Sequence, residues 1–369
     1  MLKYRDEKDI SACGIFGIMD RKGRRFNGKL VIEAMSQMKV RGNGLGAGFA
    51  VYGLYKKFKE YYAFHVMIYD KDGREKLEKF LSTNFDIVYV DEIPVNDKAK
   101  VIDPPKFMRY FVAPRKKGTE KVLNDDDFVV KKVMYINRAI PGVYVISSGK
   151  NMGVFKGVGF PEDIADYFMI EEYKGYIWTA HTRFPTNTPG WWGGAHPFSI
   201  LDWSVVHNGE ISSYGTNKRY LEMYGYYSTL QTDTEVITYI FDLLVRRQGL
   251  PIEVVSKILA PPMWEEIDRM PEKEKKFYKA LRMVYSPILL NGPWAIIVAR
   301  HGEMIGLTDR IRLRPLTVAE KKSFLIISSE EAPIRYLFRD VDRIYTPYGG
   351  ELVVGKLEED IKKFVGESQ

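Results

Sequence analysis

The order of apolar segments along the 369 residues constrains the fold more than any other feature of this sequence. Strand-like runs dominate the first 206 residues, helical spacing dominates residues 232–283, and strand-like runs return between 294 and 354. An element that is apolar on one face must bury that face against another element. The order therefore predicts an α+β protein built as a four-layer αββα sandwich, and no repeat or flexible linker separates its parts.

The strand-like runs are short, and they cover residues 13–19, 46–55, 61–69, 85–90, 143–147, 154–158, 176–181, 203–206, 294–305, 316–318, 324–328 and 351–354. Helical spacing covers residues 28–40, 74–81, 161–173, 232–247 and two stretches within 251–283. Thr232 and Glu235 form a capping box where the helix at 232 begins. Residues 56–140 are expected to be an inserted small α+β segment, because prolines punctuate its later part. Residues 355–369 are expected to be a C-terminal helix or tail.

Composition limits the class of protein. With 45% hydrophobic and 14% aromatic residues the chain can bury a large core, and its apolar runs are too short to span a membrane. One cysteine fits a reducing cytoplasm. The net charge of +7 is spread among acidic residues, which favours a solvated surface over nucleic-acid binding. Four glutamines and many charged residues are typical of thermophiles.

Cys13 is the only cysteine, and it opens the apolar string Cys13-Gly14-Ile15-Phe16-Gly17-Ile18. It is either a core thiol or a nucleophile that becomes N-terminal when a propeptide, residues 1–12, is cut off behind Ala12. The thiolate is the reactive form and a free thiol has a pKa of about 8.5, so a catalytic cysteine needs a base. A freed α-amino group, with a pKa of about 7.7 to 8.0, is such a base on the same residue.

Four polar motifs follow in order: Ala180-His181-Thr182-Arg183-Phe184-Pro185-Thr186-Asn187-Thr188, Ala195-His196-Pro197-Phe198, His207-Asn208-Gly209-Glu210-Ile211 and Thr232-Asp233-Thr234-Glu235. Together with Cys13-Gly14-Ile15-Phe16-Gly17, this order resembles the class II, N-terminal nucleophile (Ntn) glutamine amidotransferases, and most closely the amidotransferase domain of glutamate synthase. The resemblance spans residues 13–354. It implies the Ntn-hydrolase form of the αββα sandwich and L-glutamine as substrate.

The resemblance also implies roles for single residues: nucleophile for Cys13, α-carboxylate clamp for Arg183, ammonium partner for Asp233, oxyanion hole for the Asn208 side chain and the Gly209 N–H, further substrate contacts for Thr186 and Asn187, and support of the nucleophile strand for Arg41. The chemistry suits these residue types, because a guanidinium pairs bidentately with a carboxylate. Each also has a structural alternative: an ion pair for Arg183, a helix-dipole acid for Asp233 and a hairpin turn for Asn208-Gly209.

Two further features lie near these motifs. His181, His196 and His207 have spacings of 15 and 11 residues, which match no common zinc pattern, so we expect hydrogen-bonded strand histidines and no metal. Residues Trp191 to Gly194 are either a mobile flap near the glutamine pocket or a rigid aromatic anchor.

Class II amidotransferases normally carry a second, ammonia-consuming domain, and no motif of such a domain occurs here. The resemblance therefore implies an amidotransferase subunit without cofactor, working with a separate glutamate synthase subunit that holds FMN and iron–sulfur clusters. Departures from the family strings at Pro185, His196, Ser212-Ser213 and Ile311-Arg312 leave N-methylglutamate synthase open as the alternative partner. If Cys13 is never exposed, the chain would instead be a non-catalytic glutamine-sensing or scaffold subunit.

Overall fold

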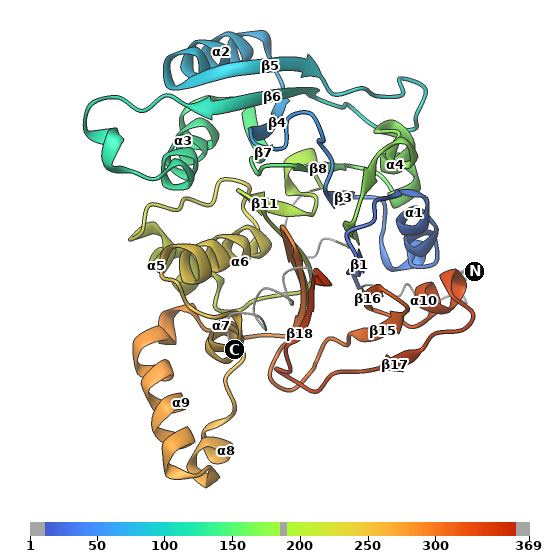
Figure 1. Ribbon diagram of the computed structural model, residues 1–369, viewed down its shortest axis with the longest axis vertical. Coiled ribbons are helices and arrows are strands. Elements are labelled where there is room, and N and C mark those ends of the chain that lie inside the picture. Colours follow the sequence, from blue (N-terminus) through green and yellow to red (C-terminus); the bar gives the residue numbers. More distant parts are fainter. Residues whose placement is uncertain (1–11, 185–189, 359–369) are drawn as a thin grey trace, which may run out of the picture.

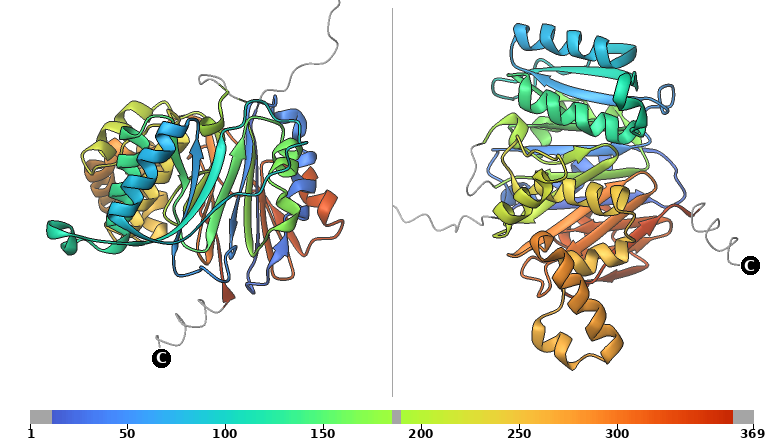
Figure 2. Two further views of the ribbon diagram at one scale, coloured as in Figure 1. Left: turned by 90° about the horizontal axis from the view of Figure 1, so that it is seen from above. Right: turned by 90° about the vertical axis from the view of Figure 1, so that its left-hand side faces the viewer.

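The computed structural model describes residues 12–184 and 190–358. Thr186 and Asn187, nearly all of the expected propeptide and residues 359–369 of the expected tail lie outside these residues. Two antiparallel sheets lie face to face at the centre of the molecule (Figures 1 and 2).

The larger sheet has seven strands in the order β17-β15-β16-β1-β10-β3-β8. Their bounds are β1 Gly14–Asp20, β3 Ala47–Tyr52, β8 Met152–Gly157, β10 Ile177–Thr182, β15 Thr317–Lys321, β16 Phe324–Ser328 and β17 Arg343–Tyr345. Strand β1 is completely buried between β10 and β16, with Gly14 opposite Thr182 and Phe16 opposite Ser328. The residue that precedes β1 is therefore held at the end of a central strand.

The second sheet has five strands in the order β11-β12-β13-β14-β18. Their bounds are β11 Phe198–Ile200, β12 Trp203–Gly209, β13 Trp294–Arg300, β14 Glu303–Thr308 and β18 Val353–Lys356. Residues such as Ile15, Ile177, Val206 and Ile297 form the apolar core between the two sheets. Alternating side chains of each strand supply this core, as strand geometry requires.

Helices cover the outer faces of both sheets. On the seven-stranded sheet they are α1 (Lys29–Ser36), α4 (Pro161–Tyr167) and α10 (Ala332–Leu337); on the five-stranded sheet they are α5 (Tyr214–Glu222), α6 (Asp233–Phe241) and α7 (Ile252–Leu259). The order of layers is helix, sheet, sheet, helix (Figure 2). The expected αββα sandwich is confirmed.

Residues 62–147, which include most of the expected insertion 56–140, form a separate unit at the top of Figure 1, and we call this unit the inserted segment. It is a four-stranded antiparallel sheet in the order β5-β6-β4-β7, with two helices packed on it. The bounds are β4 Tyr62–Ile68, α2 Lys71–Asn84, β5 Phe85–Glu92, β6 Lys106–Pro114, α3 Asp125–Ala139 and β7 Val143–Ser147. The apolar face beneath α2 and α3 joins the core beneath α5, α6 and α7 in one continuous cluster.

Several boundaries differ from the sequence prediction. The run 294–305 is a hairpin of β13 and β14, because Gly302, with φ +78°, turns the chain between them. Helix α4 ends six residues before the predicted end at 173. Residues 251–283 hold three helices, α7, α8 (Trp264–Arg269) and α9 (Glu272–Tyr285), where two were predicted. Strand β6 and helix α3 were not predicted.

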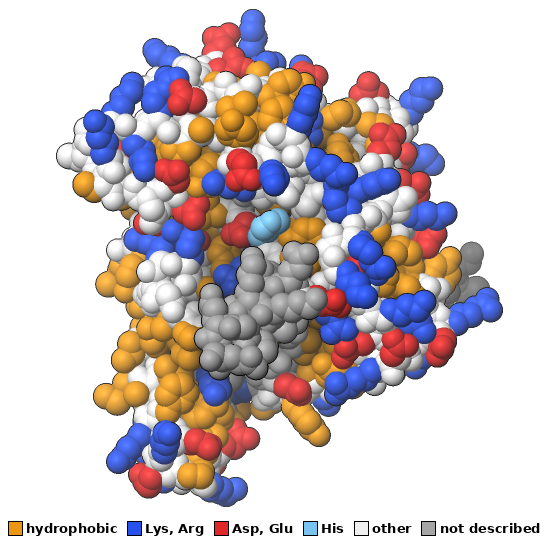
Figure 3. Space-filling model, in the orientation of Figure 1, with side chains coloured by type: hydrophobic (Ala, Val, Ile, Leu, Met, Phe, Trp, Pro, Cys, Tyr) orange, Lys and Arg blue, Asp and Glu red, His pale blue; other side chains and the backbone are white. Residues whose placement is uncertain are grey.

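The remaining elements are short. They are β2 Phe26–Asn27, β9 Lys174–Gly175, the 3-10 helices η1 Lys39–Arg41, η2 Gly118–Val122, η3 Ile170–Glu172, η4 Trp192–Gly194 and η6 Ser286–Ile288, and the π-helix η5 Asp242–Arg247, which continues α6. Across residues 12–184 and 190–358, none of the helices is long and apolar enough to cross a membrane. Basic and acidic side chains lie intermixed over much of the face in Figure 3.

Candidate active site

Four of the predicted site residues meet at one cavity of about 560 Å³. Cys13 precedes β1, Arg183 follows β10, Gly209 ends β12 and Asp233 begins α6, and all four line the cavity. Arg183 and Asp233 thus lie close to Cys13 although they are distant from it in the sequence, because strands of both central sheets end at this edge. A cavity of this size suits a small substrate.

Cys13 is half-buried, and its environment keeps the thiol protonated. The N–H of Phe184 donates to its Sγ at 3.3 Å, and the thiol lies 3.8 Å from the Phe184 carbonyl oxygen. Burial raises the pKa of Cys13, and the Phe184 N–H and the charge of Arg183 only partly offset this effect. The thiol therefore needs a base before it can attack a carbonyl carbon.

Because Cys13 is the only thiol, its titration can be followed directly. In a chain that still carries residues 1–12, we expect the rate of alkylation by iodoacetamide to rise with pH. The midpoint of this rise should lie above pH 8.5, which is about the pKa of a free cysteine. The reason is that a raised pKa lowers the thiolate fraction at any given pH. Mass spectrometry of the Cys13 peptide measures the rate, and a midpoint at or below that of free cysteine would contradict this assignment.

Arg41 holds the backbone of the cysteine in place. Its Nε donates to the carbonyl oxygen of Cys13 at 3.1 Å, and its guanidinium forms an ion pair with Glu330. Ser329 supports the same strand, because its Oγ accepts from the N–H of Ile15 at 3.1 Å. Arg41 thus touches the residue whose position it was predicted to support, and it does not line the cavity.

Arg183 is 4% exposed, and it nevertheless lines the cavity. Its backbone N–H donates to Gly46, which fixes the residue directly after β10. Burial lowers the pKa of its guanidinium, while Cys13, Asp233 and Glu210 oppose that effect. Arginine stays protonated in proteins, so Arg183 supplies a buried positive charge beside the thiol.

Asp233 supplies the matching negative charge. It is the first residue of α6, after the N-cap Thr232, and its Oδ2 accepts from the N–H of Ile211 at 3.1 Å. His207 Nδ1 lies 3.5 Å from Oδ1. Burial raises the pKa of Asp233, but His207 and the hydrogen bonds outweigh burial, so the pKa is below its usual value. The carboxylate is therefore charged at neutral pH, as a partner for an ammonium group must be.

Asn208 and Gly209 end strand β12, but only Gly209 lines the cavity. Gly209 has φ +136°, and a Cβ there would lie 2.0 Å from the Pro293 carbonyl oxygen, so the position requires glycine. The Asn208 side chain is buried, and its Nδ2 donates to Ser329 Oγ at 3.4 Å. The bond is long, so the amide N–H group of Asn208 is only weakly bound. It lies close to β1, the strand that directly follows Cys13.

The three histidines stack at the wall of the cavity, which His196 and His207 line. The rings of His181 and His196 lie 3.9 Å apart at 14°, and His207 follows at 6.5 Å from His196. Each ring has a hydrogen-bond partner. His181 Nε2 pairs with the carbonyl oxygen of His207, and His207 Nδ1 and His196 Nε2 both pair with Thr234 Oγ1. Burial holds the pKa of His181 and of His196 well below the usual value, so these two rings are neutral.

Two charged side chains beside this stack are buried, and sequence reasoning missed Lys156 altogether and the burial of Glu235. Lys156 on β8 is completely buried, with its Nζ 3.0 Å from the Gly193 carbonyl oxygen and 4.0 Å from the centre of the Phe198 ring. Glu235 accepts from the backbone N–H groups of Thr229 and Leu230. Burial lowers the pKa of Lys156 to about 7 and raises that of Glu235 to about 7. The signal for Lys156 was a single charged residue inside an otherwise apolar strand.

The Trp191 to Gly194 segment is anchored in the described structure. Trp192 is buried, and its Nε1 donates to the carbonyl oxygen of Ile102 at 3.0 Å, while Trp191 packs edge-on against Tyr144. Neither tryptophan lines the cavity that contains Cys13. These contacts favour the rigid anchor over the flap.

Comparison with known proteins defines the class. The family model for glutamine amidotransferases class-II matches residues 70–344. A protein of Archaeoglobus fulgidus with no characterised function is 67% identical over 360 residues, which are 97% of this chain and 95% of that protein. The glutamine–fructose-6-phosphate aminotransferase of Vibrio vulnificus is 30% identical over 178 residues, 48% of this chain and 26% of the enzyme.

Among solved structures, the glutamine phosphoribosylpyrophosphate amidotransferase of B. subtilis aligns with a TM-score of 0.46 and 14% identity, over 94% of this chain and 49% of that one. This chain thus spans about a quarter of the Vibrio enzyme and about half of the B. subtilis enzyme. The match to the family model covers most of the sequence. The chain belongs to the class II glutamine amidotransferases.

Proposed function

We propose that this chain hydrolyses L-glutamine to glutamate and ammonia through a thioester on Cys13, and supplies the ammonia to a separate glutamate synthase subunit. The observation that carries the proposal is the cavity in which a thiol, a buried guanidinium and a charged carboxylate face one space. Glutamine presents an amide, an α-carboxylate and an α-ammonium, which need these three partners.

The chemistry follows from these groups. The α-amino group of Cys13, freed by a cut behind Ala12, takes the thiol proton as the sulfur attacks the amide carbon. The tetrahedral oxyanion that forms is stabilised by the Asn208 amide and the Gly209 N–H. The C–N bond then breaks, ammonia leaves with a proton from the α-ammonium, and a thioester remains. Water attacks the thioester, the C–S bond breaks, and glutamate leaves.

The proposed partner carries FMN and iron–sulfur clusters and uses the ammonia. The Vibrio vulnificus relative is named for a reaction that pairs glutamine with an acceptor, fructose 6-phosphate, which supports transfer of the nitrogen beyond simple hydrolysis. A protruding hairpin of α8 and α9, at the bottom of Figure 1, supports a protein partner. Helix α9 buries none of its residues, and its Met283 and Val284 are 81% and 62% exposed. Exposed apolar side chains gathered on one feature mark interaction surfaces.

We expect the chain to co-purify with the synthase subunit, and its glutaminase activity to rise when that subunit and 2-oxoglutarate are added. Val284→Glu should abolish this rise and leave the basal activity unchanged, because α9 lies outside the cavity. The matched control is Val122→Glu, at an 87% exposed position on η2. A chain that elutes alone and hydrolyses glutamine at full rate unaided would instead be a simple glutaminase.

Arg183→Lys keeps the positive charge but loses the planar fork, so the KM for glutamine should rise. The expected cost is about 1.5 to 3 kcal/mol in kcat/KM. Steady-state kinetics measure it, with Arg300→Lys on β13 as the control at an arginine outside the cavity. An unchanged KM in Arg183→Lys would place the carboxylate clamp elsewhere.

A further inference from the structure

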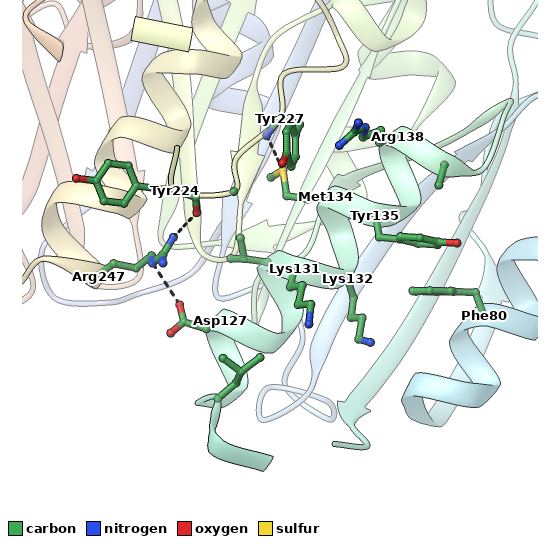
Figure 4. A pocket seen from close by; sticks show the side chains of 14 residues that line it. Phe80, Asp127, Lys131, Lys132, Met134, Tyr135, Arg138, Tyr224, Tyr227 and Arg247 are labelled. Atoms are coloured by element: carbon green, nitrogen blue, oxygen red, sulfur yellow. Dashed lines mark hydrogen bonds and ion pairs between the residues drawn. The ribbon is translucent and has the colours of Figure 1, made fainter. Parts of the chain in front are cut away.

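A second cavity lies between the inserted segment and the helical layer, away from Cys13. Its volume of about 790 Å³ exceeds that of the glutamine pocket, and helix α3 supplies most of its lining (Figure 4). We call it the α3 groove. Helix α2 contributes Phe80, the chain after α5 contributes Tyr224 and Tyr227, and η5 contributes Arg247. None of these residues takes part in the proposed hydrolysis.

The floor and walls of the α3 groove suit a flat ring. Val130 and Met134 are buried apolar residues at its base. Phe80 and Tyr135 stack in parallel with their centres 4.8 Å apart, and Tyr227 presents its ring at the other side, beside Arg138 (Figure 4). Aromatic faces next to apolar side chains bind planar ligands by stacking.

The α3 groove also carries an excess of positive charge. Its lining includes four cations and one acid: Lys131, Lys132, Arg138, Arg247 and Asp127. Glu120 is shared by Lys131 at 3.3 Å and Lys132 at 2.9 Å. Asp127 is bound by Arg246 at 2.9 Å and lies 3.7 Å from Arg247. Two carboxylates therefore face more cations than they can neutralise.

Arg138 is the cation most available to a ligand. Within the described part of the chain it forms no ion pair, and its guanidinium lies 4.6 Å from the centre of the Tyr227 ring. It is exposed near the end of α3. A guanidinium beside an aromatic face can bind an anionic group while the ring next to it stacks on the same ligand.

The backbone at the opposite edge is unusual. Arg247 is the last residue of the π-helix η5, and its Nη1 donates to the Tyr224 carbonyl oxygen at 2.9 Å. π-Helices are rare and are frequent at functional sites. Here the π-helix brings a second guanidinium to the rim of the α3 groove.

We propose that the α3 groove binds a nucleoside phosphate. The base stacks against the aromatic side chains over the floor of Val130 and Met134, and the phosphates bind Arg138 and the neighbouring cations. The cations alone would bind any anion, and the apolar floor alone would bind any apolar ring. Only the two together select a ligand that has both a ring and phosphates. A cavity of this volume holds a ligand of that size.

The test is calorimetric titration of the full chain with ATP, tripolyphosphate and adenosine, in the absence of glutamine. Binding is read without turnover, so its result is independent of whether the chain hydrolyses glutamine. ATP should bind at least about tenfold more tightly than tripolyphosphate or adenosine, because only ATP carries both the ring and the charges.

Two variants locate the site. Arg138→Gln should weaken ATP binding about tenfold, and Tyr227→Leu, which keeps apolar bulk but removes the aromatic face, should weaken ATP binding but not tripolyphosphate binding. Arg335→Gln on α10, which removes an exposed guanidinium from another face, is the control and should bind ATP normally. Circular dichroism verifies the fold of each variant. The proposal fails if ATP does not bind at millimolar concentration, if tripolyphosphate binds as tightly, or if Arg138→Gln has no effect.

Discussion

Cys13→Ala is expected to abolish glutamine hydrolysis while the chain stays folded. The substitution removes the only thiol from the cavity, and with it the bond-forming atom of the proposed reaction. The structural cost is small, because the sulfur accepts one hydrogen bond, from the Phe184 N–H at 3.3 Å. Ammonia release measures the activity, and circular dichroism measures the fold.

Two further measurements separate a nucleophile from a structural thiol. An electrophilic glutamine analogue should add to Cys13 in the wild-type chain and leave Cys13→Ala unlabelled. The intact mass of the active protein should correspond to a chain that begins at Cys13, and Ala12→Pro should leave an uncut, silent precursor. Glutaminase activity retained in Cys13→Ala, or full turnover by the uncut chain, would show that another nucleophile or another base operates.

Asn208→Ala is expected to lower kcat about 100- to 1000-fold, or about 2.7 to 4 kcal/mol, with little change in KM. The amide would stabilise the oxyanion, which exists only in the transition state and intermediate. Asn208 does not line the cavity and bonds to Ser329 Oγ in the resting structure, so its amide must turn from Ser329 to the oxyanion. Steady-state kinetics distinguish this effect from lost substrate binding.

The two matched variants are Asn208→Asp and Ser329→Ala. Asn208→Asp keeps the shape of the side chain but replaces the N–H donor with a carboxylate oxygen, so it should be as slow as Asn208→Ala. Ser329→Ala removes the resting partner of the amide, and its kcat should fall far less. Because Ser329 also accepts from the N–H of Ile15, a Ser329→Ala variant as slow as Asn208→Ala would mean that support of strand β1, and not the contact with the oxyanion, limits the rate.

The layers of the fold could be predicted because each depends on local patterns. Strand β1 is an unbroken apolar run, and Thr232 caps α6 through the N–H of Glu235, which is one half of the predicted capping box. The Glu235 side chain instead accepts from the N–H groups of Thr229 and Leu230. Strand β6 was missed because Pro105 and Pro114 lie at its ends, and prolines in a sequence usually indicate a break in a strand. The third helix within 251–283 was missed because Pro262 and Pro271 divide one pattern of helical spacing into short pieces.

The site residues could be predicted where the type of residue determines the chemistry. They could not be predicted where burial in the folded chain determines it. Arg183 and Asp233 could be named from the sequence, and the structure brings both to the cavity of Cys13. The stack of His181 on His196 could not be predicted from the sequence, because ring contacts depend on how β10 and the chain before β11 meet in three dimensions. The same holds for Lys156, whose shifted pKa comes from neighbours distant in sequence.

The inserted segment and the outer helical layer share one apolar cluster, with Phe128 and Val133 of α3 in the same core as Ile240 and Leu244. Side chains that bury each other become exposed to solvent together when either part unfolds. Removal of the inserted segment would therefore expose apolar side chains of the helical layer to water. In a calorimeter the two parts should melt in a single transition, and shortened versions designed for structural work should keep both.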